Sequence, residues 1–207
     1  MDPIELSEPE TAGSTSVERA IATRESRRSF ARTPVELEDV AQLLWAAQGV
    51  THQRDGVEMR AAPSAGATYP LVVFLASSAT GVDELEAGLY RYQPGDHALE
   101  LERERAVYDD LVRAAMGQEV VRDAPATIVL TADYDRTRGQ YPEHGDRYVH
   151  MEAGHVAENV HLVGESRGLG SCPVGAFVDD DVTDALDLPA PLEPLYLLPF
   201  GNRSSDQ

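Results

Sequence analysis

The residues best suited to chemistry lie near the N-terminus, in the stretch TRESRRSF at positions 23–30. Arg24, Ser26 and Arg28 alternate there around a predicted helix end, and Arg27 adds a further cation. Guanidinium groups form bidentate, charge-assisted hydrogen bonds with phosphate, and a serine hydroxyl adds another donor. The segment therefore suits a phosphate monoester. The alternative is a surface arginine cluster that pairs with acidic neighbours.

The charge of the whole chain makes this basic cluster unusual. The 207 residues include 17 basic residues, all arginine, against 36 acidic ones, for a net charge of −19. Such a surface argues against nucleic acid and anionic membranes as partners, because both are polyanions. We interpret the acidic excess without lysine as a halophilic adaptation, since salt screens self-repulsion. An ordinary acidic bacterial protein is the alternative.

Three further motifs offer chemistry but lack the structural context that it needs. The G-x-S-x-G pattern at 164–168 falls at a predicted helix end, whereas a nucleophile elbow needs a strand before the serine. His150 and His155 are five residues apart, so they point to different faces of a helix, and we expect no metal site. The glycine-rich stretch 168–175 has Pro173 in place of the third glycine of a dinucleotide fingerprint.

The elements that must position these residues follow from hydrophobic periodicity and turn residues. Helices are predicted over 16–28, 36–50, 105–116, 148–167 and 180–186. Strands are predicted over 71–77, 126–134 and 194–201, and a hairpin is predicted from 87–94 and 97–101. Residues 51–56 are expected to form a polar loop, and residues 60–70 an irregular segment. Mixed helices and strands without regular alternation indicate an α+β domain.

Length and composition indicate one globular domain, which we place at residues 17–203. Residues 1–16 are read as an acidic, partly flexible arm without the features of a signal peptide, and residues 204–207 as a tail. The single cysteine, Cys172, fits a reducing cytoplasm and is read as a small buried thiol. No apolar run approaches the length of a membrane span.

An ordered series of short motifs over about residues 18–203 resembles the FMN-dependent nitroreductase family. Within that family it is most similar to the SagB-type dehydrogenases, the branch that contains the thiazole- and oxazole-forming oxidases. The motifs are RESRRSF (24–30), LLWAAQGV (43–50), RAAPSAGATYPL (60–71), AGLYRY (87–92), APATIVLTADY (124–134), RYVHMEAGHVAENVHL (147–162), GLGSCPVGAF (168–177) and PLYLLPFG (194–201).

The resemblance implies a nitroreductase-like fold, with a central, mostly antiparallel sheet flanked by helices, in an intimate homodimer with FMN at the interface. The N-terminal segment would hold the FMN phosphate and ribityl chain through Arg24, Ser26 and Arg28, with Glu25 between them. We expect Arg27 to turn toward an acidic neighbour. Arg203 is the candidate for a second phosphate contact.

The resemblance also implies which residues line the flavin ring. A small-residue loop would come from the partner chain, and its members are Pro63, Ser64, Ala65 and Gly66. Small residues let the backbone approach a flat ring closely. A second loop would bring backbone N–H groups near flavin N5 and O4, from Val174, Gly175 or Ala176. A donor aimed at N5, assigned to Gly175, would stabilise the reduced cofactor.

The implied function is hydride transfer through flavin N5 between a nicotinamide donor, NADH or NADPH, and a small organic acceptor. In the azoline-oxidising members, a Lys-Tyr pair stands where this chain has Gln140 and Tyr141. A neutral amide is no general base, which leaves Tyr141 as the second catalytic candidate. One alternative is a SagB-type dehydrogenase that acts with a partner protein on a peptide-derived or other cyclic C–N substrate. Gln140 instead favours a non-catalytic flavin-binding or scaffold protein.

Overall fold

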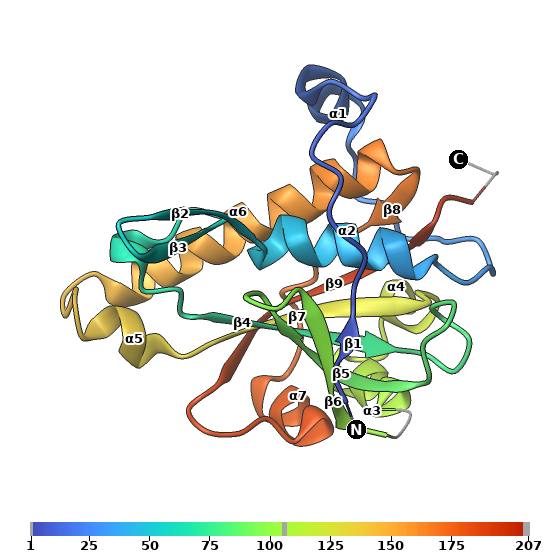
Figure 1. Ribbon diagram of the computed structural model, residues 1–207. Coiled ribbons are helices and arrows are strands. Elements are labelled where there is room, and N and C mark those ends of the chain that lie inside the picture. The colour runs from blue at the N-terminus through green and yellow to red at the C-terminus, as the bar shows by residue number, and fades with distance from the viewer. Residues whose placement is uncertain (1, 105–106, 205–207) are drawn as a thin grey trace.

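A seven-stranded antiparallel sheet forms the centre of the protein in the computed structural model, which describes residues 2–104 and 107–204 (Figure 1). Its strand order is β1-β6-β5-β4-β7-β9-β8. The strands are β1 (Ile4–Glu5), β4 (Leu71–Ser77), β5 (Gly88–Gln93), β6 (Ala98–Arg103), β7 (Ala126–Ala132), β8 (Leu169–Ser171) and β9 (Glu193–Asn202). All residues of β4 and β7 are buried, because helices cover both faces of the sheet. The expected α+β class is confirmed.

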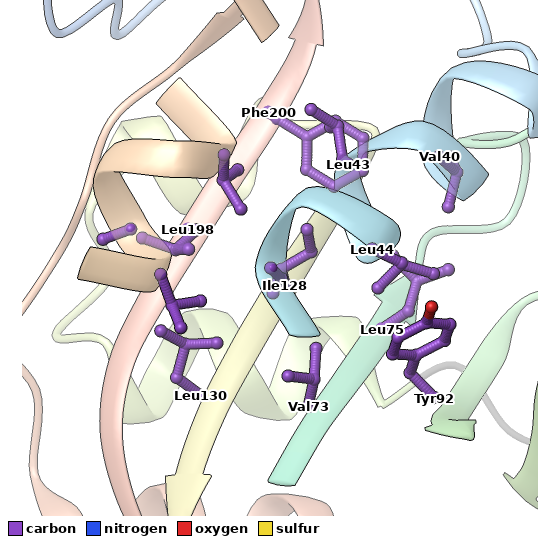
Figure 2. Packing of buried hydrophobic residues seen from close by; sticks show 14 of the residues in the cluster. Val40, Leu43, Leu44, Val73, Leu75, Tyr92, Ile128, Leu130, Leu198 and Phe200 are labelled. Atoms are coloured by element: carbon purple, nitrogen blue, oxygen red, sulfur yellow. The ribbon is translucent and has the colours of Figure 1, made fainter. Parts of the chain in front are cut away.

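Helices form a layer on each face of this sheet. The long helices α2 (Leu37–Gln48) and α6 (Gly145–Ser166) lie on one face, where Leu43 and Leu44 pack over Val73 and Ile128 (Figure 2). On the other face, Phe74 and Val129 pack with three shorter helices. These are α3 (Tyr108–Ala114), α4 (Glu119–Arg122) and α7 (Asp179–Leu186). Successive residues of one strand thus enter two different cores, as the period of two requires.

The first helix is shorter than the sequence indicated. α1 spans Val17–Thr23, and Ser16 caps it by accepting a hydrogen bond from the backbone N–H of Arg19. Arg24 leaves the helical region with φ −59° and ψ 130°. The expected helix over 16–28 is therefore wrong beyond Thr23. The chain continues instead beside β8, where the backbone N–H of Arg27 donates to the carbonyl of Ser171 at 3.0 Å.

The expected polar loop at 51–56 is a β-hairpin, formed by β2 (Val50–Arg54) and β3 (Val57–Arg60). Its turn residues Asp55 and Gly56 both have positive φ, 52° and 79°, which matches the Asp-Gly signature of a tight hairpin. Most of the strand residues are exposed, so the hydrophobic alternation that identifies a strand is missing. The irregular character expected for 60–70 is confirmed, apart from Arg60 at the end of β3 and one 3-10 turn, η1 (Ala65–Ala67).

Several element boundaries differ from the expectations. The strand predicted over 126–134 ends at Ala132, because the Asp133 side chain caps α5 (Tyr134–Arg138) by accepting from the N–H of Asp135. The expected helix over 148–167 begins earlier, at Gly145. The expected helix over 105–116 is observed as α3, and Arg105 and Ala106 lie outside the described residues.

The described part of the N-terminal arm makes specific contacts with the domain. β1 pairs with β6, and the backbone of Glu10 exchanges two hydrogen bonds with the Gln42 amide, of 2.8 and 3.0 Å. Arg167 at the end of α6 pairs with Glu10 at 3.2 Å and also with Glu38 and Asp39 on α2. These contacts join the arm to the two long helices.

The fold predicts where a substitution is costly. Ile128 is fully buried between β4, β9 and the long helices, so Ile128→Ala should lower the free energy of unfolding by about 2–5 kcal/mol. Val57→Ala is the control, because Val57 is 43% exposed, and its effect should stay within about 0.5 kcal/mol. Urea unfolding followed by circular dichroism measures both, and equal effects would contradict this description of the core.

Candidate functional site

The segment after α1 presents three predicted residues on one side. Because residues 24–28 run in an extended conformation beside β8, alternate side chains share a face. Arg24, Ser26 and Arg28 therefore share one face, whereas Glu25 and Arg27 share the other and form an ion pair of 3.1 Å. The residues that the sequence analysis named thus share a face, but the reason is the period of a strand and not the end of a helix.

The two outward arginines are weakly partnered. The nearest carboxylate to Arg24 is that of Glu158, at 3.8 Å from Nε. Arg28 is exposed and donates to the carbonyl of Ser26 at 3.3 Å, and within the described chain it forms no ion pair. Two positive charges thus face solvent in a protein with a net charge of −19. An anion is the complementary ligand for such a site.

Arg27 and Arg203 have a different environment, because both pair with one buried carboxylate. Glu165 on α6 is 6% exposed, and its Oε2 lies 3.1 Å from Arg27 and 2.7 Å from Arg203. Arg203 also donates to the carbonyls of Glu165 and Leu169. The expectation that Arg27 turns to an acidic neighbour is confirmed. The guanidinium of Arg203 is largely occupied within the protein, so a phosphate contact from it stays a prediction.

A buried polar cluster lies beneath the arginine segment. His161 on α6 shares a hydrogen bond of 2.8 Å with Ser171 at the end of β8. Burial lowers the pKa of His161 to about 4, and the nearby charges of Arg24 and Arg27 add to this effect. The imidazole is therefore neutral at physiological pH. It supports Ser171, whose backbone carbonyl accepts the hydrogen bond from Arg27.

Cys172 follows β8 and lies beside the arginine face. Its thiol is buried and free, as the sequence indicated. Burial raises its pKa, while the charge of Arg28 and a hydrogen bond with Ser26 oppose this increase. These interactions place Ser26 and Arg28 next to the start of the loop 173–177.

The loop after Cys172 offers two backbone donors. Val174 is committed to β9, since its N–H donates to Leu197 at 2.8 Å and its carbonyl accepts in return at 3.0 Å. Gly175 and Ala176 are exposed, and in the described part of the chain their N–H groups have no hydrogen-bond acceptor. Gln118 holds the loop by donating to the carbonyl of Ala176 at 2.6 Å. The sequence analysis missed Gln118, because no local pattern marks a side chain that braces a distant loop.

The small-residue loop 63–66 lies elsewhere along α6. The hydroxyl of Ser64 accepts from the N–H of Tyr69 at 2.9 Å and also bonds to the buried carboxylate of Glu152. Burial raises the pKa of Glu152. Gly66 has φ +60°, and an added Cβ would lie 2.3 Å from Oε1 of Gln140. The positive φ therefore favours glycine at this position, while the terminal amide of Gln140 could shift to relieve the contact.

Gln140 and Tyr141 lie between α5 and α6, next to this loop. They stand at the positions where the azoline-oxidising members have a Lys-Tyr pair. The side-chain amide of Gln140 lies against Gly66. Tyr141 is half-buried, with its ring packed edge-on against Tyr148 at 5.2 Å between centroids. The structure thus brings the loop 63–66, Gln140 and Tyr141 together in a second cluster.

The two clusters are far apart within one chain. Ser64 bonds to Glu152 near the start of α6, whereas Arg27 pairs with Glu165 near its end. Glu165 lies thirteen positions after Glu152 in the helix, which corresponds to about 20 Å along the axis. The loop 63–66 and the arginine segment are therefore anchored at different levels of α6.

The serine and histidine motifs lie in ordinary structural positions. Ser166, the serine of the G-x-S-x-G pattern, is the last residue of α6 and bonds to the carbonyl of Val163. His150 shares a hydrogen bond of 2.7 Å with Tyr134. No group of three or more metal-ligating side chains occurs in residues 2–104 and 107–204. Over the same residues, no helix is both long and apolar enough to cross a membrane.

Comparison with known proteins agrees with this architecture. The profile of the nitroreductase family matches residues 21–202, which is most of the chain. The chain belongs to the nitroreductase family. MJ1384 of Methanocaldococcus jannaschii, provisionally named a nitroreductase, is 37% identical over 187 residues, covering 90% of this chain and 91% of that protein. As a member of this family, the protein is an oxidoreductase by class.

One solved structure and one further sequence relative show which members of the family this chain is similar to. A provisionally named nitroreductase from Ralstonia eutropha JMP134 superposes with a TM-score of 0.83 at 32% identity, covering 98% of this chain and 90% of that one. The microcin B17-processing protein McbC of Escherichia coli is 27% identical over 157 residues, covering 73% of this chain and 57% of McbC. McbC represents the SagB-like branch, so the resemblance found in the sequence is confirmed.

The site geometry predicts a pH dependence of stability. Since the pKa of His161 is about 4 in the folded protein and 6.5 for an ordinary histidine, the unfolded chain binds more protons between these values. Folding stability should therefore fall as pH falls from 6.5 toward 4, by at most about 3 kcal/mol from this group. His161→Asn should show a shallower fall, by up to about 1.4 kcal/mol per pH unit.

Urea unfolding at constant salt from pH 4.5 to 7.5 measures this difference. The subtraction of the two curves removes the carboxylate titrations that the proteins share. The exposed His155→Asn variant is the matched control for removal of a histidine from the same helix. Parallel stability curves for the wild type and His161→Asn would contradict the assignment.

Proposed function

We propose that the protein is an FMN-dependent oxidoreductase of the nitroreductase type that acts as a homodimer. One observation supports this most strongly. Arg24 and Arg28 present weakly partnered guanidinium groups beside Ser26, and next to them Gly175 and Ala176 present backbone N–H groups without acceptors in the described chain. Cations suited to a phosphate and donors suited to a flavin ring thus lie on adjoining segments.

The arginine face would bind the FMN phosphate. Arg24 and Arg28 supply charge-assisted donors, and the Ser26 hydroxyl adds a neutral one. Glu25 pairs with Arg27 on the opposite face, so its role in the FMN site would be to position the backbone rather than to contact the phosphate. Arg203 would reach the phosphate only with donors that Glu165 and Leu169 leave free.

The loop 173–177 would lie against the flavin ring. Since the N–H of Val174 is bonded to Leu197, the donors toward N5 and O4 are those of Gly175 and Ala176. FMN, when bound, supplies the redox chemistry by exchanging a hydride at N5 with a nicotinamide donor, NADH or NADPH, and with a small organic acceptor. The protein contributes orientation and a fixed N–H dipole at Gly175.

The other side of the ring would be formed by a second copy of the chain. The loop residues Pro63, Ser64, Ala65 and Gly66 lie about 20 Å along α6 from the arginine segment, and a partner supplies them more readily than the same chain. α1 projects away from the body of the protein (Figure 1), and it exposes Val17 and Ile21 by 66% and 58%. Both features favour a homodimer with FMN at its interface.

In that arrangement Gln140 and Tyr141 accompany the loop 63–66 to the partner's flavin. The Tyr141 hydroxyl is the candidate proton donor or acceptor for the substrate, whereas the neutral amide of Gln140 only forms hydrogen bonds. A second candidate function is a SagB-type dehydrogenase that acts with a partner protein on a cyclic C–N substrate. Similarity to McbC favours it, and a chain of the Escherichia coli microcin synthetase McbBCD complex matches this fold with a TM-score of 0.74 at 23% identity.

Removal of the arginine face should abolish cofactor retention. The double variant Arg24→Ala/Arg28→Ala loses two charge-assisted contacts, each worth about 1.5–3 kcal/mol, so its affinity for FMN should fall by at least about a hundredfold. Arg54→Ala, which removes an exposed arginine from the β2–β3 hairpin, is the matched control. Fluorescence titration of the apoprotein with FMN gives the affinities, and equal affinity in both variants would exclude a phosphate role.

A mixed-dimer experiment tests whether two chains form each site. Gly66→Val should impair the loop because a β-branched residue fits a φ of +60° poorly, while leaving the arginine face intact. Mixing this variant with Arg24→Ala/Arg28→Ala creates dimers with one intact and one doubly defective site. Random pairing makes half of the dimers mixed, and one of the two sites in each mixed dimer is intact. About a quarter of the wild-type number of sites should therefore be restored. No recovery from subunits shown to exchange would contradict the shared site.

A further inference from the structure

A small pocket at the end of the sheet is lined by three arginines and by no carboxylate. Its volume is about 110 Å³, and Arg60 of β3, Arg91 of β5 and Arg136 of α5 lie in its wall. The amides of Gln48 and Gln93 add further polar groups, and Leu71–Val73 of β4 form the apolar part. In a chain with about twice as many acidic as basic residues, a pocket wall with three arginines and no carboxylate is unusual.

Arg60 is held in place but retains an unused donor. Its Nη1 donates to Gln48 at 3.0 Å, and its guanidinium stacks over the ring of Tyr69 at 4.5 Å. Its Nε is buried and has no hydrogen-bond partner in the described chain. A buried donor without a partner is costly, and a negative charge nearby would offset part of that cost.

The acidic groups around Arg60 do not neutralise the pocket. Glu152 is bonded to the far side of Gln48, at 3.3 Å from its amide nitrogen. Burial raises the pKa of Glu152 and lowers that of Arg60, although an arginine guanidinium remains protonated in proteins. Neither Glu152 nor Glu58, the other carboxylate that acts on Arg60, lies in the pocket wall.

The other two arginines also keep donors available. Arg136 donates to the carbonyl of Tyr69 at 3.0 Å and to Asp133 at 3.2 Å, which uses Nη1 and Nε. Arg91 forms no ion pair among residues 2–104 and 107–204. Its cross-strand neighbour Glu100 accepts a hydrogen bond from Gln93 instead, at 2.7 Å.

We propose that this pocket binds a small oxyanion, the carboxylate or phosphate group of a small molecule. Three like charges around one small volume repel each other, and an anion between them converts that repulsion into attraction. Guanidinium forks match the oxygen geometry of both groups. The volume exceeds the roughly 30 Å³ share of a water molecule several times, which leaves room for one such group and little more.

The occupied pocket would also steady the loop 63–66. Tyr69 connects them, since it contacts Arg60 through its ring and hydroxyl, Arg136 through its carbonyl and Ser64 through its N–H. Tyr69 and Ala67 both have positive φ, 43° and 52°, a strained conformation that surrounding contacts must hold. An anion that fixes the two arginines would hold this conformation more firmly.

Calorimetric titration of the purified protein with inorganic phosphate tests the site, with sodium chloride used to keep the ionic strength constant. Arg91→Gln and Arg136→Gln should each weaken binding by about tenfold or more, because each removes a charged donor and leaves the Arg60 network in place. Arg54→Gln, an exposed arginine of the neighbouring hairpin, is the control and should leave the affinity unchanged. Phosphate affinity that is the same in all three variants would overturn the proposal.

The Arg24→Ala/Arg28→Ala variant separates this pocket from the proposed FMN phosphate site. Phosphate binding that persists in that variant and disappears on addition of Arg91→Gln supports a second site. Binding abolished by Arg24→Ala/Arg28→Ala alone would place the anion at the N-terminal segment and overturn the proposal.

A parallel titration with acetate distinguishes the two ligand sources, since a carboxylate site binds acetate and a phosphate site binds it far more weakly. These phosphate and acetate titrations do not decide whether the protein binds FMN, which the FMN titration tests separately.

Discussion

The arrangement of the site depends on the pairing of Glu165 with two arginines. A buried carboxylate needs partners, and Glu165 has Arg27 at 3.1 Å and Arg203 at 2.7 Å. This pairing joins α6 to the extended segment after α1 and to the end of β9. Because alternate residues of an extended chain point to opposite sides, fixing Arg27 inward directs Arg24 and Arg28 outward. One buried charge thereby determines which arginines can meet an anion.

The length of α6 imposes the second constraint. The helix carries the contacts of the arginine segment at one end and those of the small-residue loop near the other. A rigid helix keeps these clusters about 20 Å apart in one chain. Two copies in opposite orientation would bring an arginine face of one chain to a loop of the other. The separation of the two clusters within the monomer and the exposed apolar side chains of α1 are the observations that support the proposed dimer.

Sequence reasoning succeeded where local patterns are strong. The buried runs of β4 and β7 and the periodic helices α2 and α6 were predicted, because hydrophobic spacing determines them. The β2–β3 hairpin was missed, since its exposed strands lack that spacing and only Asp55-Gly56 marks its turn. The roles of Gln118, His161 and Arg60 could not be predicted, because each depends on a contact with residues far away in the chain.

The central claim is that the protein binds FMN and uses it for electron transfer. The most direct test is the visible spectrum of the purified protein, recorded without oxygen before and after addition of NADH or NADPH. The account predicts a flavin absorption band, about one FMN per chain, and bleaching of that band by one of the two nucleotides. Protein that neither contains nor takes up FMN would contradict the account. Bound flavin that no nicotinamide reduces would instead indicate a flavin-binding protein without the proposed donor.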